Sequence, residues 1–249
     1  MANPVLINGV GSPQSLYEVS TTKYHRLGTT GFLGDRMFRY GVNSTSSALA
    51  IALLVGQAPN VAAHQNVTIA GTAGNKYVTL AIGAGAIVAE QYADGWILQD
   101  KGTGLGQVRR VVSHGTTAGS TTVTFYIDYP WITTSASTPT GGLQKNLYAD
   151  PVVYPGNATA AAPVGVLNVA LPAGDTTSQY GWFQRSGPCP LSCEGSITVG
   201  QYVTIATATT TDAGQGRLPA DADIVPPIGV CMIPNGTDEE YALVNLMLV

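Results

Sequence analysis

The feature that most constrains the fold of this chain is a period-two alternation of side chains within short runs. In the run 121–129 (TTVTFYIDY), Val123, Phe125 and Ile127 alternate with Thr124 and other more polar residues. Successive side chains of a β-strand point to opposite faces of a sheet, so this alternation indicates strands. The predicted strands are Met37–Tyr40, Val67–Ala70, Lys76–Ile82, Gly95–Asp100, Gln107–His114, Thr121–Tyr129, Val164–Leu171, Val199–Ile205, Ile228–Ile233 and Tyr241–Val249.

Turn-forming residues separate these runs at regular intervals, which is typical of all-β proteins. The pairs Pro226-Pro227 and Asn235-Gly236 are examples, and residues 100–106 (DKGTGLG) read as a hairpin connection. The sequence therefore predicts an all-β fold of two β-sandwich or barrel-like domains with an extended N-terminal arm. The predicted boundaries are 1–40 for the arm, 41–140 for the first domain and 141–249 for the second domain, with a linker at 133–142 (TTSASTPTGG).

Two stretches leave the local structure open. Residues 43–57 (NSTSSALAIALLVGQ) have the composition of a short capped helix, yet Leu49, Ile51, Leu53 and Val55 also alternate as in a strand. Gly41 and Gly56, which flank the apolar part of this run, favour a strand. The final run, Tyr241–Val249, is apolar on both faces apart from Asn245, so we expect both faces to be covered, by the chain's own core or by a neighbouring chain.

The low charge of the chain favours a role in an assembly. Only 10% of its 249 residues are charged, against about 25% in a typical soluble domain. Its surface is therefore rich in uncharged polar residues, which suits a free β protein or a protein whose surfaces are covered by other subunits. With a net charge of −4 and no basic cluster, we expect no binding to nucleic acid.

Neither a membrane anchor nor an export signal is predicted. The longest apolar run, Ala48–Val55, is far shorter than the roughly 20 residues of a membrane helix, and the N-terminus lacks a basic region followed by an apolar run. We therefore expect a protein made in a cytoplasm. Cys189 and Cys193 fit that compartment as buried or turn residues, because Cys-x3-Cys alone is a poor zinc signal. Cys231 falls in a strand pattern and is predicted to be a core residue.

No catalytic, cofactor-binding or metal-binding residue is predicted, and the chain is not expected to be an enzyme. The histidines His25, His64 and His114 are distant in sequence and form no ligand motif. The glycines at 102, 104 and 106 lack the spacing of a dinucleotide loop. The remaining features that we assign to turns, loop tips or chance are Asp212, Asp221 and Asp223, the cluster Asp238–Glu240, and the sequons at Asn43, Asn66, Asn157 and Asn235.

Several segments together resemble capsid decoration (cement) proteins of tailed bacteriophages, which are encoded beside the major capsid protein. The resemblance runs from about Phe32 onward and is carried by structural motifs only. These segments are Gly34–Tyr40 (GDRMFRY), Leu53–Gln57 (LLVGQ), Val61–Asn66 (VAAHQN), Tyr180–Gln184 (YGWFQ), the pair Gly195 and Gly200 with Gln201, Pro227–Val230 (PIGV) and Tyr241–Val244 (YALV).

The resemblance implies a virion structural protein on the capsid surface, with the major capsid protein and its own copies, as a homotrimer, for partners. The arm 1–40 and the terminal strand are the expected contact regions. An alternative is a head-fibre base or a carbohydrate-binding β-sandwich, for which Trp96, Trp131 and Trp182 supply aromatic candidates. A hydrolase is the least favoured class, because no acid, base and nucleophile come together in the sequence.

Overall fold

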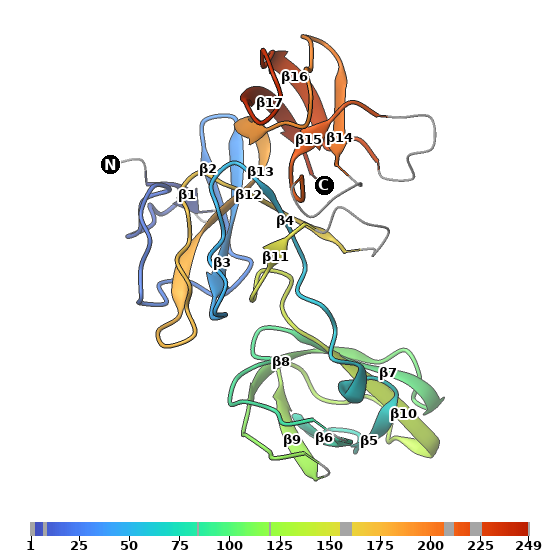
Figure 1. The fold of residues 1–249 in the computed structure, drawn as a ribbon. Coiled ribbons are helices and arrows are strands. Elements are labelled where there is room, and N and C mark those ends of the chain that lie inside the picture. Colours follow the sequence, from blue (N-terminus) through green and yellow to red (C-terminus); the bar gives the residue numbers. More distant parts are fainter. Residues whose placement is uncertain are drawn as a thin grey trace. The chain divides into compact units, whose positions relative to one another are not determined.

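The computed structural model of this chain is built from β-strands and divides into two compact units (Figure 1). It describes residues 3–6, 9–83, 85–119, 121–154, 161–206, 212–219 and 226–248. One unit is continuous and consists of residues 59–146, and the other combines residues 1–58 with 147–249. Within the described ranges the only helix is the 3-10 turn η1 (Ala62–His64), which confirms the all-β prediction.

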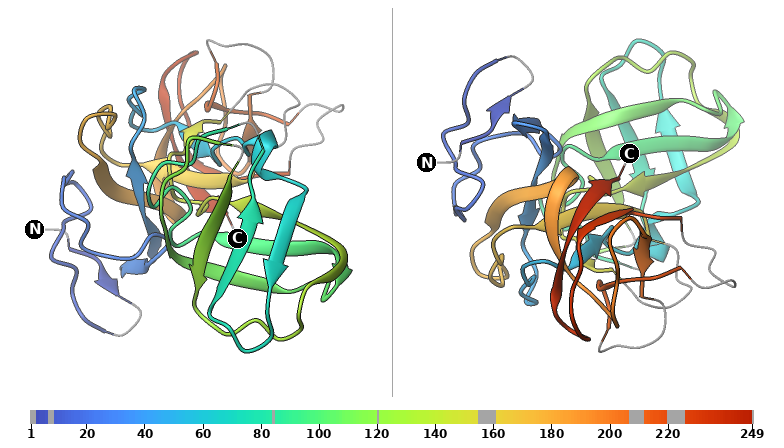
Figure 2. Two further views of the ribbon diagram at one scale, coloured as in Figure 1. Left: turned by 90° about the horizontal axis from the view of Figure 1, so that it is seen from below. Right: turned by 90° about the horizontal axis from the view of Figure 1, so that it is seen from above.

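The continuous unit is a closed six-stranded antiparallel barrel with the strand order β10-β5-β6-β9-β8-β7 (Figure 2). Inward-facing residues from all six strands fill its interior, among them Ile69, Leu80, Ile97 and Phe125. The alternation seen in the sequence is therefore the alternation between barrel interior and exterior. Its strands are β5 (Val67–Gly71), β6 (Tyr77–Ala81), β7 (Trp96–Thr103), β8 (Val108–His114), β9 (Thr122–Ile127) and β10 (Ala136–Gln144).

Five of these strands were predicted at nearly the observed positions, and the hairpin between β7 and β8 is confirmed. Gly102, Gly104 and Gly106 all have positive φ angles in that connection, a conformation that glycine adopts without steric cost. The glycine triplet is thus a feature of the turn.

The predicted linker at 133–142 is wrong, because most of it belongs to β10. This strand pairs with both β5 and β7 and so closes the barrel. A side chain at Gly141 would place its Cβ 2.5 Å from the Leu98 carbonyl oxygen, so the close approach of the two strands requires glycine here. Small residues in this stretch reflect tight packing between strands.

The second unit is an eleven-stranded sheet that gathers both ends of the sequence. Its main path runs β1-β2-β3-β13-β17-β16-β14-β15, while β4, β11 and β12 pair beside it. The strands are β1 (Val5–Leu6), β2 (Thr30–Leu33), β3 (Arg36–Asn43), β4 (Leu54–Gly56), β11 (Val152–Val153), β12 (Pro163–Leu167), β13 (Gln179–Ser192), β14 (Tyr202–Ile205), β15 (Gly216–Arg217), β16 (Gly229–Ile233) and β17 (Tyr241–Met247).

The long strand β13 joins the two ends of the chain in this sheet. Its first part pairs with β3 through contacts such as Trp182 with Tyr40, and its second part pairs with β17 through contacts such as Cys189 with Val244. This pairing explains why the boundaries predicted at residues 40 and 140 differ from the observed division. Strands from before residue 58 and after residue 147 complete one sheet, and the barrel is inserted between them in the sequence.

The N-terminal segment is part of this unit and does not extend away from it as the predicted arm would. Leu16 and Leu27 are buried in one cluster with Phe38 and Trp182. The amide of Gln14 donates to the Tyr180 carbonyl oxygen at 2.9 Å, and its own oxygen accepts a hydrogen bond from the Tyr40 hydroxyl at 3.0 Å. Two leucines and one fully buried amide therefore anchor the N-terminal segment to the sheet, although its sequence has no strong periodicity.

The two stretches left open by the sequence are resolved by the structure. Within 43–57 no helix forms, and the strand β4 is confined to Leu54–Gly56, while Leu49 exchanges two backbone hydrogen bonds with Leu171. In β17, Ala242 and the other even-numbered residues are buried, whereas Tyr241 and Met247 are exposed. The expectation that both faces of β17 are covered therefore holds within this chain for one face only.

Candidate functional site

Two of the three histidines lie close together in the structure, and the third lies in the other unit. His64 and His114 both contact Tyr92 inside the barrel unit, whereas His25 lies in the other unit beside Tyr40. The Nδ1 atom of His64 is 2.5 Å from the Tyr92 hydroxyl, and Nε2 of His114 accepts a hydrogen bond from the Tyr92 backbone amide at 2.9 Å. The two rings belong to residues that are 1% and 4% exposed, so they tie the loop around Tyr92 to the barrel.

The electrostatics of these buried groups fit a structural role. Burial lowers the pKa of His64 below its ordinary value, and burial raises the pKa of the Cys189 thiol to about 12. All three cysteines are buried free thiols, which confirms the prediction for Cys231. In the described part of the chain, no three His, Cys, Asp or Glu residues are grouped to hold a metal ion. Asp221 and Asp223 lie outside the described residues.

The acidic cluster at 238–240 lies in the connection between β16 and β17, as predicted for a hairpin tip. Glu240 accepts hydrogen bonds from the backbone amides of Gly236 and Thr237 at 2.8 and 3.0 Å, and these bonds lower its pKa. Asp238 accepts one from the Gly195 amide at 2.8 Å. The carboxylates of Asp238 and Glu240 therefore shape this loop.

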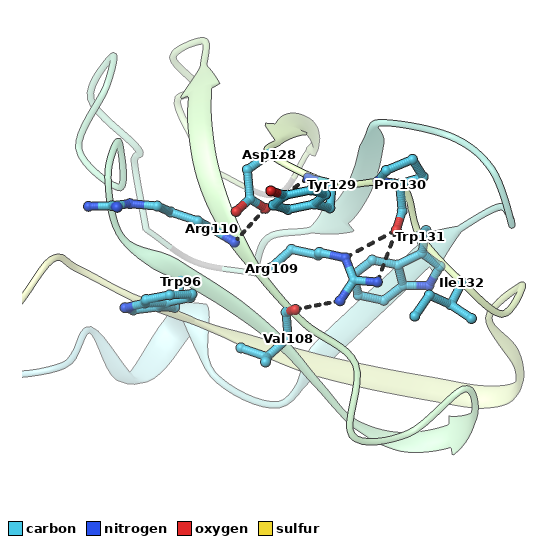
Figure 3. Close-up of a pocket in the computed structure, with 9 residues that line it drawn as sticks. All are labelled: Trp96, Val108, Arg109, Arg110, Asp128, Tyr129, Pro130, Trp131 and Ile132. Atoms are coloured by element: carbon cyan, nitrogen blue, oxygen red, sulfur yellow. Dashed lines mark hydrogen bonds between the residues drawn. The ribbon is translucent and has the colours of Figure 1, made fainter.

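A groove of about 480 Å³ lies on the barrel unit, between the start of β7, strand β8 and the segment that follows β9 (Figure 3). Trp96 and Arg110 are direct cross-strand partners, and the Arg110 guanidinium lies 6.0 Å from the centre of the Trp96 ring. Tyr129 and Ile132 come from the segment after β9 and are 70% and 72% exposed. The groove thus combines exposed apolar rings with charged groups.

Hydrogen bonds hold the segment after β9 in place along the groove. The Arg109 guanidinium donates to the Pro130 carbonyl oxygen from Nε at 3.1 Å and from Nη2 at 2.9 Å, and lies 5.8 Å from the centre of the buried Trp131 ring (Figure 3). The Asp128 carboxylate accepts from the backbone amides of Arg110 and Tyr129 at 3.1 and 2.9 Å. These contacts fix the position of the segment that forms one side of the groove.

A second candidate surface is the outward side of strands β14, β16 and β17, which we call the β17 face. It presents Tyr202, Val230, Ile233, Tyr241, Leu243, Asn245 and Met247. Cross-strand pairs such as Val230 with Asn245 and Ile233 with Leu243 place these residues on one side of the sheet. None of the three strands contains a charged residue. The β17 face is therefore uncharged over neighbouring strands and, apart from Asn245, built from apolar and tyrosine side chains.

Comparison with known proteins identifies no relative of this chain. No protein-family model, no curated protein and no solved structure matches it. In the described ranges, none of the helical segments has the length and apolarity of a membrane span. The features of the molecule that bear on function are therefore the groove and the β17 face.

Sequence reasoning found some members of these surfaces and missed others. Of the three candidate tryptophans, Trp96 is 45% exposed at the groove, whereas Trp131 and Trp182 are each 1% exposed and belong to the cores. The groove residues Arg109, Asp128 and Tyr129 were not singled out. For Asp128 and Tyr129 the sequence offers one indication, the aromatic segment 128–132 (DYPWI) directly after a strand. That this segment lies beside Arg109 in β8 follows only from the barrel fold.

Proposed function

We propose that this chain is a virion structural protein of the capsid decoration class, which binds the outer surface of a phage head and stabilises capsomer contacts. The proposal combines the resemblance of the segments from Phe32 onward with the low charge of the whole chain. The observation that carries it is the β17 face. Its partners are the major capsid protein and further copies of the chain as a homotrimer.

The β17 face has the physical properties of a subunit contact. Tyr241, Tyr202 and Met247 are 59%, 58% and 42% exposed, so a partner can still bury much of their apolar area. Each Å² of apolar surface removed from water contributes about 25 cal/mol. A single small contact is weak, but symmetric copies repeat it on one particle, and linked contacts raise the net affinity without new chemistry.

Particles assembled from the adjacently encoded major capsid protein test this proposal. The purified chain should co-sediment with expanded particles and raise their melting temperature in calorimetry. Met247→Lys and Tyr241→Lys place a charge on the β17 face and should each weaken co-sedimentation by about tenfold or more, because the charge loses its hydration in the contact.

The matched control is Leu105→Lys, which makes the same kind of change at a side chain that is 69% exposed in the β7–β8 hairpin. This variant should bind as the unchanged chain does. The proposal is contradicted if the chain does not bind particles, and the role of the β17 face is contradicted if Leu105→Lys weakens binding as much as Met247→Lys.

A further inference from the structure

We infer that the barrel groove is a binding site for a neutral saccharide, with sugar rings stacked on Trp96 and Tyr129. Both aromatic side chains are well exposed, at 45% and 70%. Trp and Tyr rings contribute most binding energy when they are covered, so these two rings are available to a ligand. A volume of about 480 Å³ falls within the range of roughly 300–1,000 Å³ that is usual for small-molecule sites. The site is independent of the β17 face, because both of its sides belong to the barrel unit.

The polar groups of the groove are placed to select hydroxyl groups. Two backbone amides bind Oδ1 of Asp128, which fixes the carboxylate beside Tyr129 (Figure 3). Within the described residues, its Oδ2 atom has no hydrogen-bond partner. A fixed carboxylate oxygen accepts hydrogen bonds from sugar hydroxyls, and ionised acceptors form stronger bonds than neutral ones. A pyranose ring has an apolar C–H face and a rim of hydroxyls, which match an aromatic ring beside a carboxylate.

The groove is preorganised, which favours binding of a small ligand. The three donor nitrogens of Arg109 bind the carbonyl oxygens of Pro130 and Val108 at 2.7–3.1 Å, so the segment carrying Tyr129 is anchored to β8. Trp96 is likewise paired in register with Arg110 across β7 and β8. Little conformational entropy is therefore lost when a ligand binds, and more of the contact energy appears as affinity.

The charges of the groove favour a neutral ligand over a nucleic acid. Arg109, Arg110 and Asp128 are the charged residues that line the groove, and the buried Asp94, which is not part of the lining, pairs with Arg110. Arg110 Nε lies 3.8 Å from the Asp94 carboxylate, and Arg109 already binds backbone carbonyl oxygens. Single-stranded nucleic acids stack on aromatic rings too, but their sites also need a positive track along the phosphates. With Arg110 paired to Asp94 and Arg109 bound to backbone carbonyl oxygens, the groove offers no such track.

An array of short neutral oligosaccharides of glucose, galactose, mannose and N-acetylglucosamine tests the inference with the full chain. We expect hits on the array and quenching of Trp96 fluorescence by the same sugars in solution. Trp96→Ala and Tyr129→Ala should each weaken the affinity by about tenfold or more, because truncation removes a stacking surface. Trp96→Phe retains a ring and should keep part of the affinity. Asp128→Asn should weaken binding through the loss of an ionised acceptor.

The matched control is Tyr77→Ala, which removes a 46% exposed aromatic ring from the same barrel at β6, away from the groove. It should leave sugar binding unchanged, and circular dichroism should show that all variants are folded. The inference is overturned if no sugar on the array binds, if Trp96→Ala binds as well as the unchanged chain, or if single-stranded DNA binds in the groove and the sugars do not displace it.

Discussion

The two units differ in how they avoid long unpaired edge strands in their β-sheets. The barrel closes on itself through β10, so each of its six strands has a neighbour on both sides. The other unit is an open sheet whose main path ends at the two-residue strands β1 and β15. Very short edge strands discourage pairing with other chains, whereas closure removes the edges altogether. Within the described residues, neither unit therefore presents a long edge strand to a partner, and the surfaces available for binding are the barrel groove and the β17 face.

In each unit a buried glutamine donates hydrogen bonds to backbone carbonyl oxygens of its own strand. Gln99 in the barrel donates to the carbonyl oxygens of Lys101 and Thr103 at 2.9 and 2.7 Å, and Gln184 in the open sheet donates to that of Pro188 at 2.8 Å. Both residues are 0% exposed. Each lies where the pairing register of its strand shifts, and its amide donates to backbone carbonyl oxygens next to that shift.

The largest predicted effect tests whether the units unfold separately. Trp131→Ala in the barrel and Trp182→Ala in the open sheet each remove a fully buried ring and should cost about 3–5 kcal/mol of unfolding free energy. Calorimetry should show that each change lowers the transition of its own unit only. The three cysteines all lie in the open-sheet unit, so Trp182→Ala should speed their reaction with a thiol reagent and Trp131→Ala should not.

A single cooperative transition that both substitutions lower equally would break the distinction between the units. The same conclusion would follow if Trp131→Ala exposed the cysteines as readily as Trp182→Ala does.

The next effect compares the two glutamines. Gln99→Leu and Gln184→Leu should each destabilise their unit by about 1–3 kcal/mol, because backbone carbonyl oxygens within the strand lose their side-chain donor. Denaturant titration measures the change. Gln179→Leu is the control, since Gln179 begins the same strand as Gln184, is only half-buried and donates to a single local carbonyl oxygen. It should change stability by less than about 0.5 kcal/mol. Equal losses at all three positions would contradict the special role of the two buried amides.

The smallest effect is a difference in pH dependence. Burial lowers the pKa of His64 below 6.5, so on acidification the unfolded chain binds a proton before the folded barrel does. The barrel should keep its full stability above about pH 6.5 and lose stability as the pH falls below that value. His64→Gln should flatten this dependence when melting is followed between pH 7.5 and 5.

His25 provides the counterpart in the open sheet. Burial lowers its pKa too, but its side chain is only half-buried, so the open sheet should respond less to acid than the barrel. A barrel transition that does not change with pH, or one that stays pH-dependent in His64→Gln, would rule out His64 as the titrating group.

The barrel strands could be predicted from the sequence because local alternation determines which residues face inward. Residues 121–129 are typical, since Val123, Phe125 and Ile127 all reach the barrel core. The division into units could not be predicted in this way. It depends on β3 pairing with β13, which lies some 140 residues later, and on β10, whose small residues pair on both sides without an apolar pattern.

The candidate sites were predictable only in part for the same reason. The final strand was expected to contact a partner, and the structure leaves one of its faces exposed. The sequence does not distinguish exposed Trp96 from buried Trp131, because both follow turn residues in aromatic segments. Only the register of β7 against β8 places Trp96 beside Arg110, and only the Arg109 bonds to Pro130 place Tyr129 across from them.

Methionine oxidation on and off capsid particles tests the central proposal most directly. Met247 lies on the β17 face and Met232 lies beside it, at the register shift of β16. They are 42% and 45% exposed, so hydrogen peroxide should convert both to the sulfoxide readily in the free protein. If the β17 face is the contact surface, mass spectrometry will show that both methionines oxidise several-fold more slowly on the particle. Equal oxidation rates in the free and the particle-bound protein would contradict the proposal.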